Sequence, residues 1–462
     1  MSACRRPSHP RPRRRRLALV ALCLGFLVVQ LDVTVVNVAL EAIRREIGGS
    51  LSDQQWVVDS YTLVLAAGML GAGSSGDRFG VRRVYAAGMI LFALASVACA
   101  LAPGIAALVA ARAVQGAGAA ALLPCSLALI VRQFPTPTAR AHALGVWGGV
   151  GSIGMAAGPV LGAVLVASTG WRAIFLLNVP VCVLAVILLR RYVIDAERHA
   201  VVRFDLVGLV LGTVSLCCLA AGLIELGQRT GGEGMAVVLV AVGCVLFGLF
   251  AVVESRRRAP MVPVAMFRRP AFSPAVTTGF LFNFCLYGAL LCVSLVFQAY
   301  LRLPSFRVGL LVFPLTVAVG IGASLSGRLT ARYGARRPML LGFGCGAAGS
   351  LVTLVGGVLG SLSVTAVGAT VLGFCSFAMP AMTSVAMAVS DPARPGLASG
   401  VLNSARQTGG ALGVAALGAL LATGGPTTAA LVPPMTVAIA AYGMAIACTL
   451  AATASTPRGS AV

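Results

Sequence analysis

A stretch of eleven residues occurs twice in this chain, as GSSGDRFGVRR at Gly73–Arg83 and as GRLTARYGARR at Gly327–Arg337. The two copies share glycine or arginine at five aligned positions, all at one constant offset. In each copy the stretch joins the second and third apolar segments of a block of six. The repeat therefore predicts two related six-helix halves, at about 17–192 and 272–453, with two extra helices between them at 205–253.

The composition is that of a membrane protein. Of the 462 residues, 58% are hydrophobic and only 10% are charged, whereas a soluble domain typically carries about 25% charged residues. Apolar segments long enough to cross ~30 Å of hydrocarbon recur from Leu17 to the C-terminus. We expect an all-α polytopic membrane protein with spans at about 17–40, 56–76, 84–102, 104–130, 141–168, 171–192, 205–227, 235–253, 272–298, 305–327, 338–358, 361–388, 396–422 and 432–453.

The formal charge of +22 is carried by arginine alone, since the chain contains no lysine. Most arginines lie in short linkers between apolar segments, which is the pattern that marks the cytoplasmic side of a membrane. We therefore expect residues 1–16 and 454–462 to be cytoplasmic tails. The alternative, a basic patch that binds nucleic acid, does not explain this distribution, and we expect no nucleic-acid partner.

The missing lysine also limits the chemistry. A P-loop ATPase and a pyridoxal enzyme both need a lysine, so neither is expected. The 13 cysteines show no ligand-like spacing, and the three histidines fall in expected tails or loops. We expect no enzyme, no catalytic residues, no metal site and no cofactor, with a proton gradient as the energy source.

One carboxylate lies deep in the first apolar segment, whose final part reads LDVTVVNVALEAI at Leu31–Ile43. A charge at that depth is costly, so Asp32 is a functional candidate. At ~1.5 Å per residue, Asp32 is ~22 Å from the cytoplasmic start of its helix and Arg112 is ~18 Å from the same side. We expect the two side chains to face one cavity and to govern proton binding together. The alternative is a static pair that only fixes packing.

Six stretches, taken together and in order, resemble the fourteen-helix drug:proton antiporter branch of the major facilitator superfamily. Three departures from the pattern are Glu41 in place of a proline, Ser75–Gly76 in place of Leu-Ala, and Val81 in place of a basic residue. The six stretches are LDVTVVNVAL, GSSGDRFGVRR, RAVQGAGAA at Arg112–Ala120, GMAAGPVLGA at Gly154–Ala163, GWRAIFLLNVP and LNSARQTGGALG.

The resemblance implies a role for each stretch. Asp32 would be the proton-coupling carboxylate, tuned by Arg112. Asp77 would latch the halves together on the cytoplasmic side; because the second copy has Ala331 at that position, the latch would be asymmetric. A solvated basic loop is the alternative for this segment. The implied gating-loop residues are Gly73, Asp77, Arg78, Gly80, Arg82 and Arg83.

Two further groups are candidates. The resemblance assigns the small-residue face and kink of the fifth helix to sealing between the halves and to antiport, whereas ordinary helix packing explains them equally well; these residues are Gly154, Gly158, Pro159 and Gly162. Five polar residues are possible members of a substrate pathway: Asn37, Gln115, Asn283, Gln298 and Arg406. Glu225 and Asp59 lie near span ends, where contact with water is the simpler interpretation.

The function expected from this sequence is proton-coupled efflux of drugs or other amphipathic small molecules across a bacterial plasma membrane. The partners would be the substrate, protons and the lipid bilayer, and the protein would work as a monomer. Two alternatives stay open. One is a dedicated exporter of a single endogenous antibiotic or metabolite, and the other is a membrane sensor that transports nothing.

Overall fold

The computed structural model describes residues 12–48, 51–193, 206–228, 233–257, 264–267, 271–297, 301–303, 305–388, 395–423 and 427–454. These residues are almost entirely helical, as their long apolar runs predict. The helices are α1 (Pro12–Ile47), α2 (Leu51–Phe79), α3 (Val81–Ala100), α4 (Ile105–Gln133), α5 (Pro137–Thr169), α6 (Arg172–Leu176), α7 (Asn178–Tyr192), α8 (Leu206–Gln228), α9 (Glu233–Arg256), α10 (Val264–Phe267), α11 (Phe272–Leu295), α12 (Ser305–Tyr333), α13 (Arg336–Leu359), α14 (Leu362–Gly373), η2 (Phe374–Phe377), α15 (Ala378–Ala388), α16 (Pro395–Thr423), η3 (Thr428–Leu431) and α17 (Val432–Ala454).

Many of these helices can cross a membrane. Among the described residues, ten are long and apolar enough, and two bent helices bring the number to twelve. In α2 the parts Trp56–Met69 and Gly71–Phe79 meet at 49°, and in α5 the parts Pro137–Met155 and Val160–Thr169 meet at 45°. The second bend coincides in sequence with Pro159, which removes a backbone donor. The chain is thus a multi-pass helical membrane protein, and the count of fourteen spans stays a prediction.

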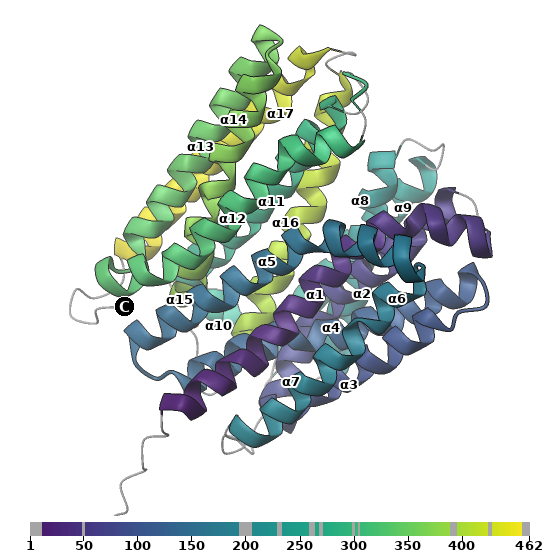
Figure 1. Ribbon diagram of the computed structural model, residues 1–462. Coiled ribbons are helices and arrows are strands. Elements are labelled where there is room, and N and C mark those ends of the chain that lie inside the picture. Colours follow the sequence, from purple (N-terminus) through teal and green to yellow (C-terminus); the bar gives the residue numbers. More distant parts are fainter. Residues whose placement is uncertain are drawn as a thin grey trace, which may run out of the picture.

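The helices form two bundles that repeat one packing pattern (Figure 1). In α1–α7, called the first half below, α1 packs against α5 and α7, while α4 packs against α2 and α3. In α11–α17, the second half, α11 packs against α16 and α17, while α14 packs against α12 and α13. Each helix of the first half thus has a counterpart with the same neighbours in the second.

Two symmetry-related contacts join the halves. The helix α5 packs against α12, and its counterpart α16 packs against α2. The extra helices α8 and α9 pack against each other, and α8 also contacts α2 and α16. The main contacts between halves therefore use the second and fifth helix of each bundle, with further contacts of α16 with α4 and of α15 with α5, and one extra helix lies beside the α2–α16 contact.

Close packing of α1 on α5 depends on glycine. An added Cβ at Gly154 would lie 2.8 Å from the Leu27 carbonyl oxygen, and one at Gly162 would lie 2.9 Å from a Val35 methyl group. One at Gly158 would overlap the Thr34 hydroxyl. These three glycines therefore face α1 in their own half, and the contact between halves is made elsewhere on α5.

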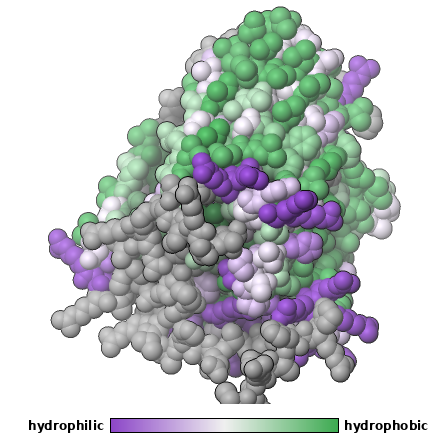
Figure 2. Space-filling model, turned by 90° about the vertical axis from the view of Figure 1, so that its left-hand side faces the viewer, coloured by the Kyte–Doolittle hydropathy of each residue, from purple (hydrophilic) through white to green (hydrophobic). Residues whose placement is uncertain are grey.

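The outer surface matches a protein surrounded by lipid. Large apolar side chains are exposed on many helices, among them Leu94, Val160 and Val245 at 64%, 61% and 70%. Figure 2 shows a broad hydrophobic surface over the upper part of one face, whereas hydrophilic residues gather mainly lower down. Exposed apolar area of this extent is typical of a membrane-facing surface.

Candidate functional site

Asp77 joins the two halves at one end of the molecule. Its Oδ1 accepts a hydrogen bond from the backbone N–H of Gly396 at 3.0 Å, and its Oδ2 accepts one from Leu397 at 2.8 Å. Both donors lie in the first turn of α16, where backbone N–H groups have no partner within the helix. A carboxylate at a helix N-terminus is also favoured by the helix dipole. The last turn of α2 in the first half thus caps a helix of the second.

Glycines bring the helices together at this end. A Cβ added at Gly396 would lie 2.5 Å from the carbonyl oxygen of Gly73, and one added at Gly73 would lie closer still to the Gly396 oxygen. At the other contact, a Cβ at Gly145 of α5 would lie 2.6 Å from the Cα of Gly327 in α12. Gly73 and Gly327 are the first residues of the repeated stretch, so both copies place a glycine where the halves cross.

The rest of the repeated stretch forms a tight turn in each half. Gly80 and Gly334 have φ values of +99° and +76°, a left-handed conformation that favours glycine. Arg78 lies 5.1 Å from the ring centre of Phe79, and the aligned Arg332 lies 5.2 Å from that of Tyr333. Arg82 donates a 2.9 Å hydrogen bond to the carbonyl oxygen of Arg190 at the end of α7, whereas Arg83 is exposed. Only the first copy caps a helix of the other half through a carboxylate, since Ala331 replaces Asp77 in the second.

Asp32 and Arg112 form a buried ion pair in the first half. Nη1 of Arg112 lies 2.5 Å from Oδ2 of Asp32, and both side chains are almost completely inaccessible. Arg112 also donates through Nε to the carbonyl oxygen of Val57 at 3.0 Å, and its guanidinium lies 4.2 Å from the ring centre of Tyr61. The pair predicted from equal depth is present, held by α1, α2 and α4.

Two amides complete the hydrogen bonding of the carboxylate. Gln115 and Asn178 each donate to Oδ1 of Asp32 at 2.9 Å. Gln115 also accepts from Nη1 of Arg112 at 2.6 Å and donates to Ser96 at 2.9 Å. Asp32 therefore has a donor for each oxygen, which is the arrangement that makes a buried charge tolerable. We call these five residues the Asp32 cluster: Asp32, Ser96, Arg112, Gln115 and Asn178.

The Asp32 cluster lies inside the first half. Its members come from α1, α3, α4 and α7, and each has 0% exposure. Asp32 and Arg112, expected to face one cavity, are enclosed by the helices of the first half in this conformation. Gln115, expected along the substrate pathway, is likewise enclosed. Asn178 and Ser96 were not among the candidates, although the amide in the apolar run GWRAIFLLNVP was a usable signal.

A second group of polar residues lies between α11 and α16. Arg406 is 8% exposed; its Nη1 is 3.5 Å from Oδ1 of Asn403, and its guanidinium is 5.8 Å from the ring centre of Phe282. Tyr287 lies near Arg406 and near the side chain of Gln30 on α1. Asn283, one turn before Tyr287, is buried at 4% exposure. This group, Gln30, Asn283, Tyr287, Asn403 and Arg406, reaches from the second half to the first.

Four predicted residues cannot be placed. Gln298 lies outside the described residues. Asn37, Pro159 and Glu225 lie in described helices, but their side chains are not described. Asp59 is half-buried in α2. Among the described residues, no group of three or more histidine, cysteine or acidic side chains is arranged to hold a metal ion.

Comparison with known proteins agrees with this architecture. Residues 22–414 match the family described as Major Facilitator Superfamily. The chain belongs to the major facilitator superfamily. Members related by sequence include the methylenomycin A resistance protein of Streptomyces coelicolor, 36% identical over 87% of this chain and 85% of that protein. The multidrug resistance protein Stp of Mycobacterium tuberculosis is 37% identical over 89% of this chain and 76% of that protein. The tetracenomycin C resistance and export protein of Streptomyces glaucescens is 34% identical over 88% of this chain and 76% of that protein.

Solved structures share the superfamily fold. The human organic anion transporter MFSD10 superposes with a TM-score of 0.69 at 16% identity, covering 95% of this chain and 100% of that one. The proton:xylose symporter XylE superposes with a TM-score of 0.68 at 14% identity, covering 96% of each. This major facilitator protein is therefore a multi-pass membrane transport protein that handles small molecules, and its sequence relatives are named for drug and antibiotic resistance or efflux.

Proposed function

We propose that this protein exports amphipathic small molecules in exchange for protons, as a member of the fourteen-helix drug:proton antiporter branch. The two spans needed beyond the twelve described above would be α8 and α16, which contain 23 and 29 residues. An even number of spans agrees with the start of α1 and the end of α17 lying at one end of the molecule in Figure 1. The arginine-rich linkers assign that end, where Asp77 also lies, to the cytoplasm.

The observation that carries the proposal is the ion pair of Asp32 with Arg112. An ionisable pair at this depth in a membrane span costs free energy, so its presence indicates a functional role. Protonation of Asp32 would remove the negative charge that pairs with Arg112, leaving the guanidinium to find another partner. Because α1, α3, α4 and α7 all contribute to the cluster, a change in that one charge affects four helices of the half. Proton binding would thereby favour one arrangement of the halves over the other.

The Asp77 contact supports alternating access. It holds α2 to the start of α16 at the cytoplasmic end, so that end is closed in this conformation. For the cytoplasmic end to open, both hydrogen bonds of Asp77 must break and both glycine crossings must separate. Rocking of two halves around a central substrate is the mode of transport that such paired bundles favour.

A test uses inside-out vesicles and three anthracene probes of equal size: 9-anthracenecarboxylate, 9-anthracenemethanol and 9-anthracenylmethylammonium. An imposed pH gradient, acid inside, should drive uptake of at least one probe in vesicles with the wild-type protein, and an uncoupler should abolish it. Asp32→Asn should lose that uncoupler-sensitive uptake at equal membrane level. The control is Glu46→Gln, which removes a carboxylate at the exposed end of the same helix. Equal uptake by Asp32→Asn and wild type would refute coupling through Asp32.

A dedicated exporter is the second candidate. It is favoured by relatives named for one antibiotic each, methylenomycin A and tetracenomycin C. No uptake of any anthracene probe by the wild type, followed by proton-driven uptake of one antibiotic, would select this candidate. A sensor would leave every transport measurement unchanged by Asp32→Asn.

A further inference from the structure

Arg406 is a buried cation that forms no ion pair with a carboxylate of the described residues. Only one acidic residue, Asp391, occurs between Phe272 and Ala454, and it precedes α16. Arg406 lies eleven residues after Pro395, about 16 Å from that end of the helix. In the first half, Asp32 bonds to Arg112, and Asp77 bonds to the start of α16. Arg406 thus differs from Arg112, although both are buried in spans.

The guanidinium of Arg406 is also incompletely hydrogen-bonded. Its Nε has no partner, and the 3.5 Å separation from Asn403 is at the limit of a hydrogen bond. A buried charge without a partner is strongly unfavourable. Arginine presents several N–H donors in a planar fork that matches a carboxylate. The donors that Arg406 leaves unused are those that such an anion would accept.

The surroundings of Arg406 fit the rest of an amphipathic anion. Phe282 supplies an aromatic face at 5.8 Å, and Gly279 lets the arginine stem pack closely on α11, since a Cβ there would lie 3.1 Å from Cγ of Arg406. Tyr287 adds a hydroxyl that also lies near Gln30 of the first half. A ligand bound by Arg406 would therefore lie where both halves reach it.

We infer that Arg406 binds the anionic group of the exported molecule, and that the substrates are amphipathic organic anions, carboxylates above all. This inference rests on the proposed export function and names its substrate class. A cationic molecule would meet the positive charge of Arg406 with no described acid beside it. Exchange of one proton inward for one monovalent anion outward moves two positive charges inward, so a membrane potential that is negative inside drives both movements.

The test is binding of the three anthracene probes to the purified full-length protein in nanodiscs, followed by probe fluorescence. The wild type should bind 9-anthracenecarboxylate at least about tenfold more tightly than the methanol and ammonium probes, because a hydrogen bond to a charged group contributes ~1.5–3 kcal/mol. Arg406→Gln should remove this preference, while Arg406→Lys should keep part of it. Binding of 9-anthracenemethanol that survives in Arg406→Gln shows that the variant is folded.

The control variant is Arg307→Gln, which removes an exposed arginine from the same half. Tighter binding of the ammonium probe, an unchanged preference in Arg406→Gln, or binding of none of the probes would each overturn the anion site. The vesicle assay separates this failure from failure of the export function, because proton-driven uptake of the ammonium or methanol probe would leave proton-coupled export intact.

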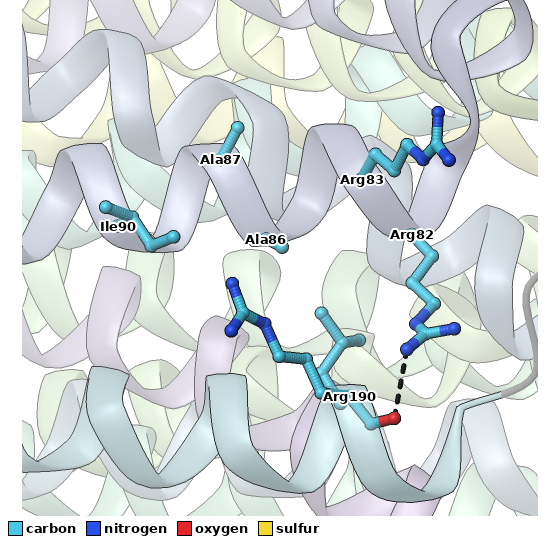
Figure 3. Close-up of a pocket in the computed structure, with 7 residues that line it drawn as sticks. Arg82, Arg83, Ala86, Ala87, Ile90 and Arg190 are labelled. Carbon is cyan, nitrogen blue, oxygen red and sulfur yellow. Dashed lines mark hydrogen bonds between the residues drawn. The ribbon is translucent and has the colours of Figure 1, made fainter.

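A different observation carries a second inference, at the cytoplasmic ends of α3 and α7. A surface cavity of about 370 Å³ lies there, lined by Arg82, Arg83, Ala86, Ala87, Ile90, Leu189 and Arg190. Figure 3 shows the side chain of Arg190 reaching from α7 toward α3, while Arg82 reaches back to the carbonyl oxygen of Arg190. No acidic residue lines the cavity, and its apolar part includes Ile90, which is 41% exposed.

We propose that this cavity binds an anionic phospholipid, with the headgroup phosphate among the arginines and an acyl chain along Ala86, Ala87 and Ile90. Basic cavities between membrane helices on the cytoplasmic side fit such headgroups, at ~1 kcal/mol per arginine. The apolar residues lie deeper along α3 than the arginines, which is the order of headgroup and chain in a bilayer. A free phosphate ion would use the arginines but not this apolar part.

Native mass spectrometry of the full-length protein tests the lipid site. We expect palmitoyl-oleoyl phosphatidylglycerol to bind about 25-fold more weakly to the double variant Arg83→Gln/Arg190→Gln, as loss of two arginines implies, and phosphatidylcholine with the same chains to be unaffected. Arg256→Gln, at the basic end of α9, is the matched control. Unchanged phosphatidylglycerol binding by the double variant would overturn the site. So would inorganic phosphate binding as tightly as the lipid.

Discussion

Gly73 of α2 and Gly396 of α16 touch through their backbones, which places the two halves in direct contact one turn from Asp77. A Cβ on Gly396 would lie 2.5 Å from the Gly73 carbonyl oxygen. The same stretch of sequence therefore supplies both the close approach and the hydrogen bonds that hold it. The following predictions begin from this contact.

Gly73→Ala should open the end of the molecule where Asp77 lies. The added methyl group overlaps backbone that cannot move without separating the helices, and such overpacking costs ~1–3 kcal/mol. Hydrogen–deuterium exchange in residues 395–400 should become roughly 5- to 100-fold faster. The control is Gly344→Ala in α13, where an added Cβ meets no atom within 4 Å. Equal exchange in both variants would show that the crossing is not a tight contact.

Asp77→Ala should have a larger effect on the start of α16 than Asp77→Asn. Asparagine keeps one acceptor oxygen for the N–H groups of Gly396 and Leu397, whereas alanine keeps none, and loss of a capping side chain costs ~1 kcal/mol. The exchange rate of those two amides should increase from wild type to Asp77→Asn to Asp77→Ala. The rate of proton-driven transport should change in the same order. Equal amide exchange rates in Asp77→Asn and Asp77→Ala would mean that these hydrogen bonds contribute little to the stability of the start of α16.

Arg112→Lys should not replace arginine. Lysine carries its donors on one nitrogen, whereas arginine donates from Nε to the Val57 carbonyl and from Nη1 to Asp32, so lysine cannot reproduce this fork. Loss of a hydrogen bond to a charged group costs ~1.5–3 kcal/mol, and Arg112→Met, which leaves Asp32 buried without its cation, should cost ~3–5 kcal/mol. Thermal unfolding in nanodiscs measures both. The double variant Asp32→Asn/Arg112→Met should regain part of the loss, and strict additivity would contradict the pairing.

Gly158→Ala should weaken the packing of α5 on α1. Its Cβ would overlap the Thr34 hydroxyl and lie 3.1 Å from the backbone nitrogen of Val35. We expect the melting temperature to fall, with partial recovery in Thr34→Ala/Gly158→Ala because part of the overlap is removed. Gly248→Ala in α9, where the added Cβ meets nothing within 4 Å, should not lower it. Full tolerance of Gly158→Ala would argue against close packing here.

Low pH should weaken a contact at the opposite end of the molecule. Glu46 at the end of α1 accepts hydrogen bonds from Arg172 and from Nε1 of Trp171, and these lower its pKa from the ordinary value of 4.5. A lowered pKa in the folded state means that the stabilisation is complete above pH 4.5 and is lost as pH falls through the folded value. The difference in melting temperature between wild type and Glu46→Gln should therefore be present at pH 7 and should shrink as the pH falls below 4.5. A difference that does not change with pH would contradict it.

The sequence predicts how deep a side chain lies in the membrane better than it predicts which way that side chain points. Helical rise is fixed, so counting residues was enough to place Asp32 and Arg112 at the same level. Which way a side chain points depends on the rotation of its helix against its neighbours, and residue counting carries no information about that. The enclosed position of the Asp32 cluster, with Asn178 from α7, therefore emerges only from the structure.

The glycines of α5 also show that a sequence pattern does not identify the helix against which a segment packs. Small residues in Gly154–Gly162 indicate that a helix approaches closely, but not which helix, and the partner is α1 of the same half. The repeated stretch was more informative, because its two copies predicted equivalent positions for Gly73 and Gly327. Both glycines lie where the halves cross, and Asp77 accepts hydrogen bonds from the start of α16, whereas the aligned position in the second copy is Ala331.

The uneven distribution of acids has a consequence for energy conversion. Every described carboxylate within a six-helix half belongs to the first, while the helices of the second contain no aspartate, glutamate, histidine or lysine. A proton that drives transport through these halves must therefore be taken up by the first, and under our proposal the second recognises the cargo by a permanent positive charge. The proton site and the substrate site would then lie in different halves. They would be coupled mechanically during a cycle, through movements at the α2–α16 and α5–α12 contacts.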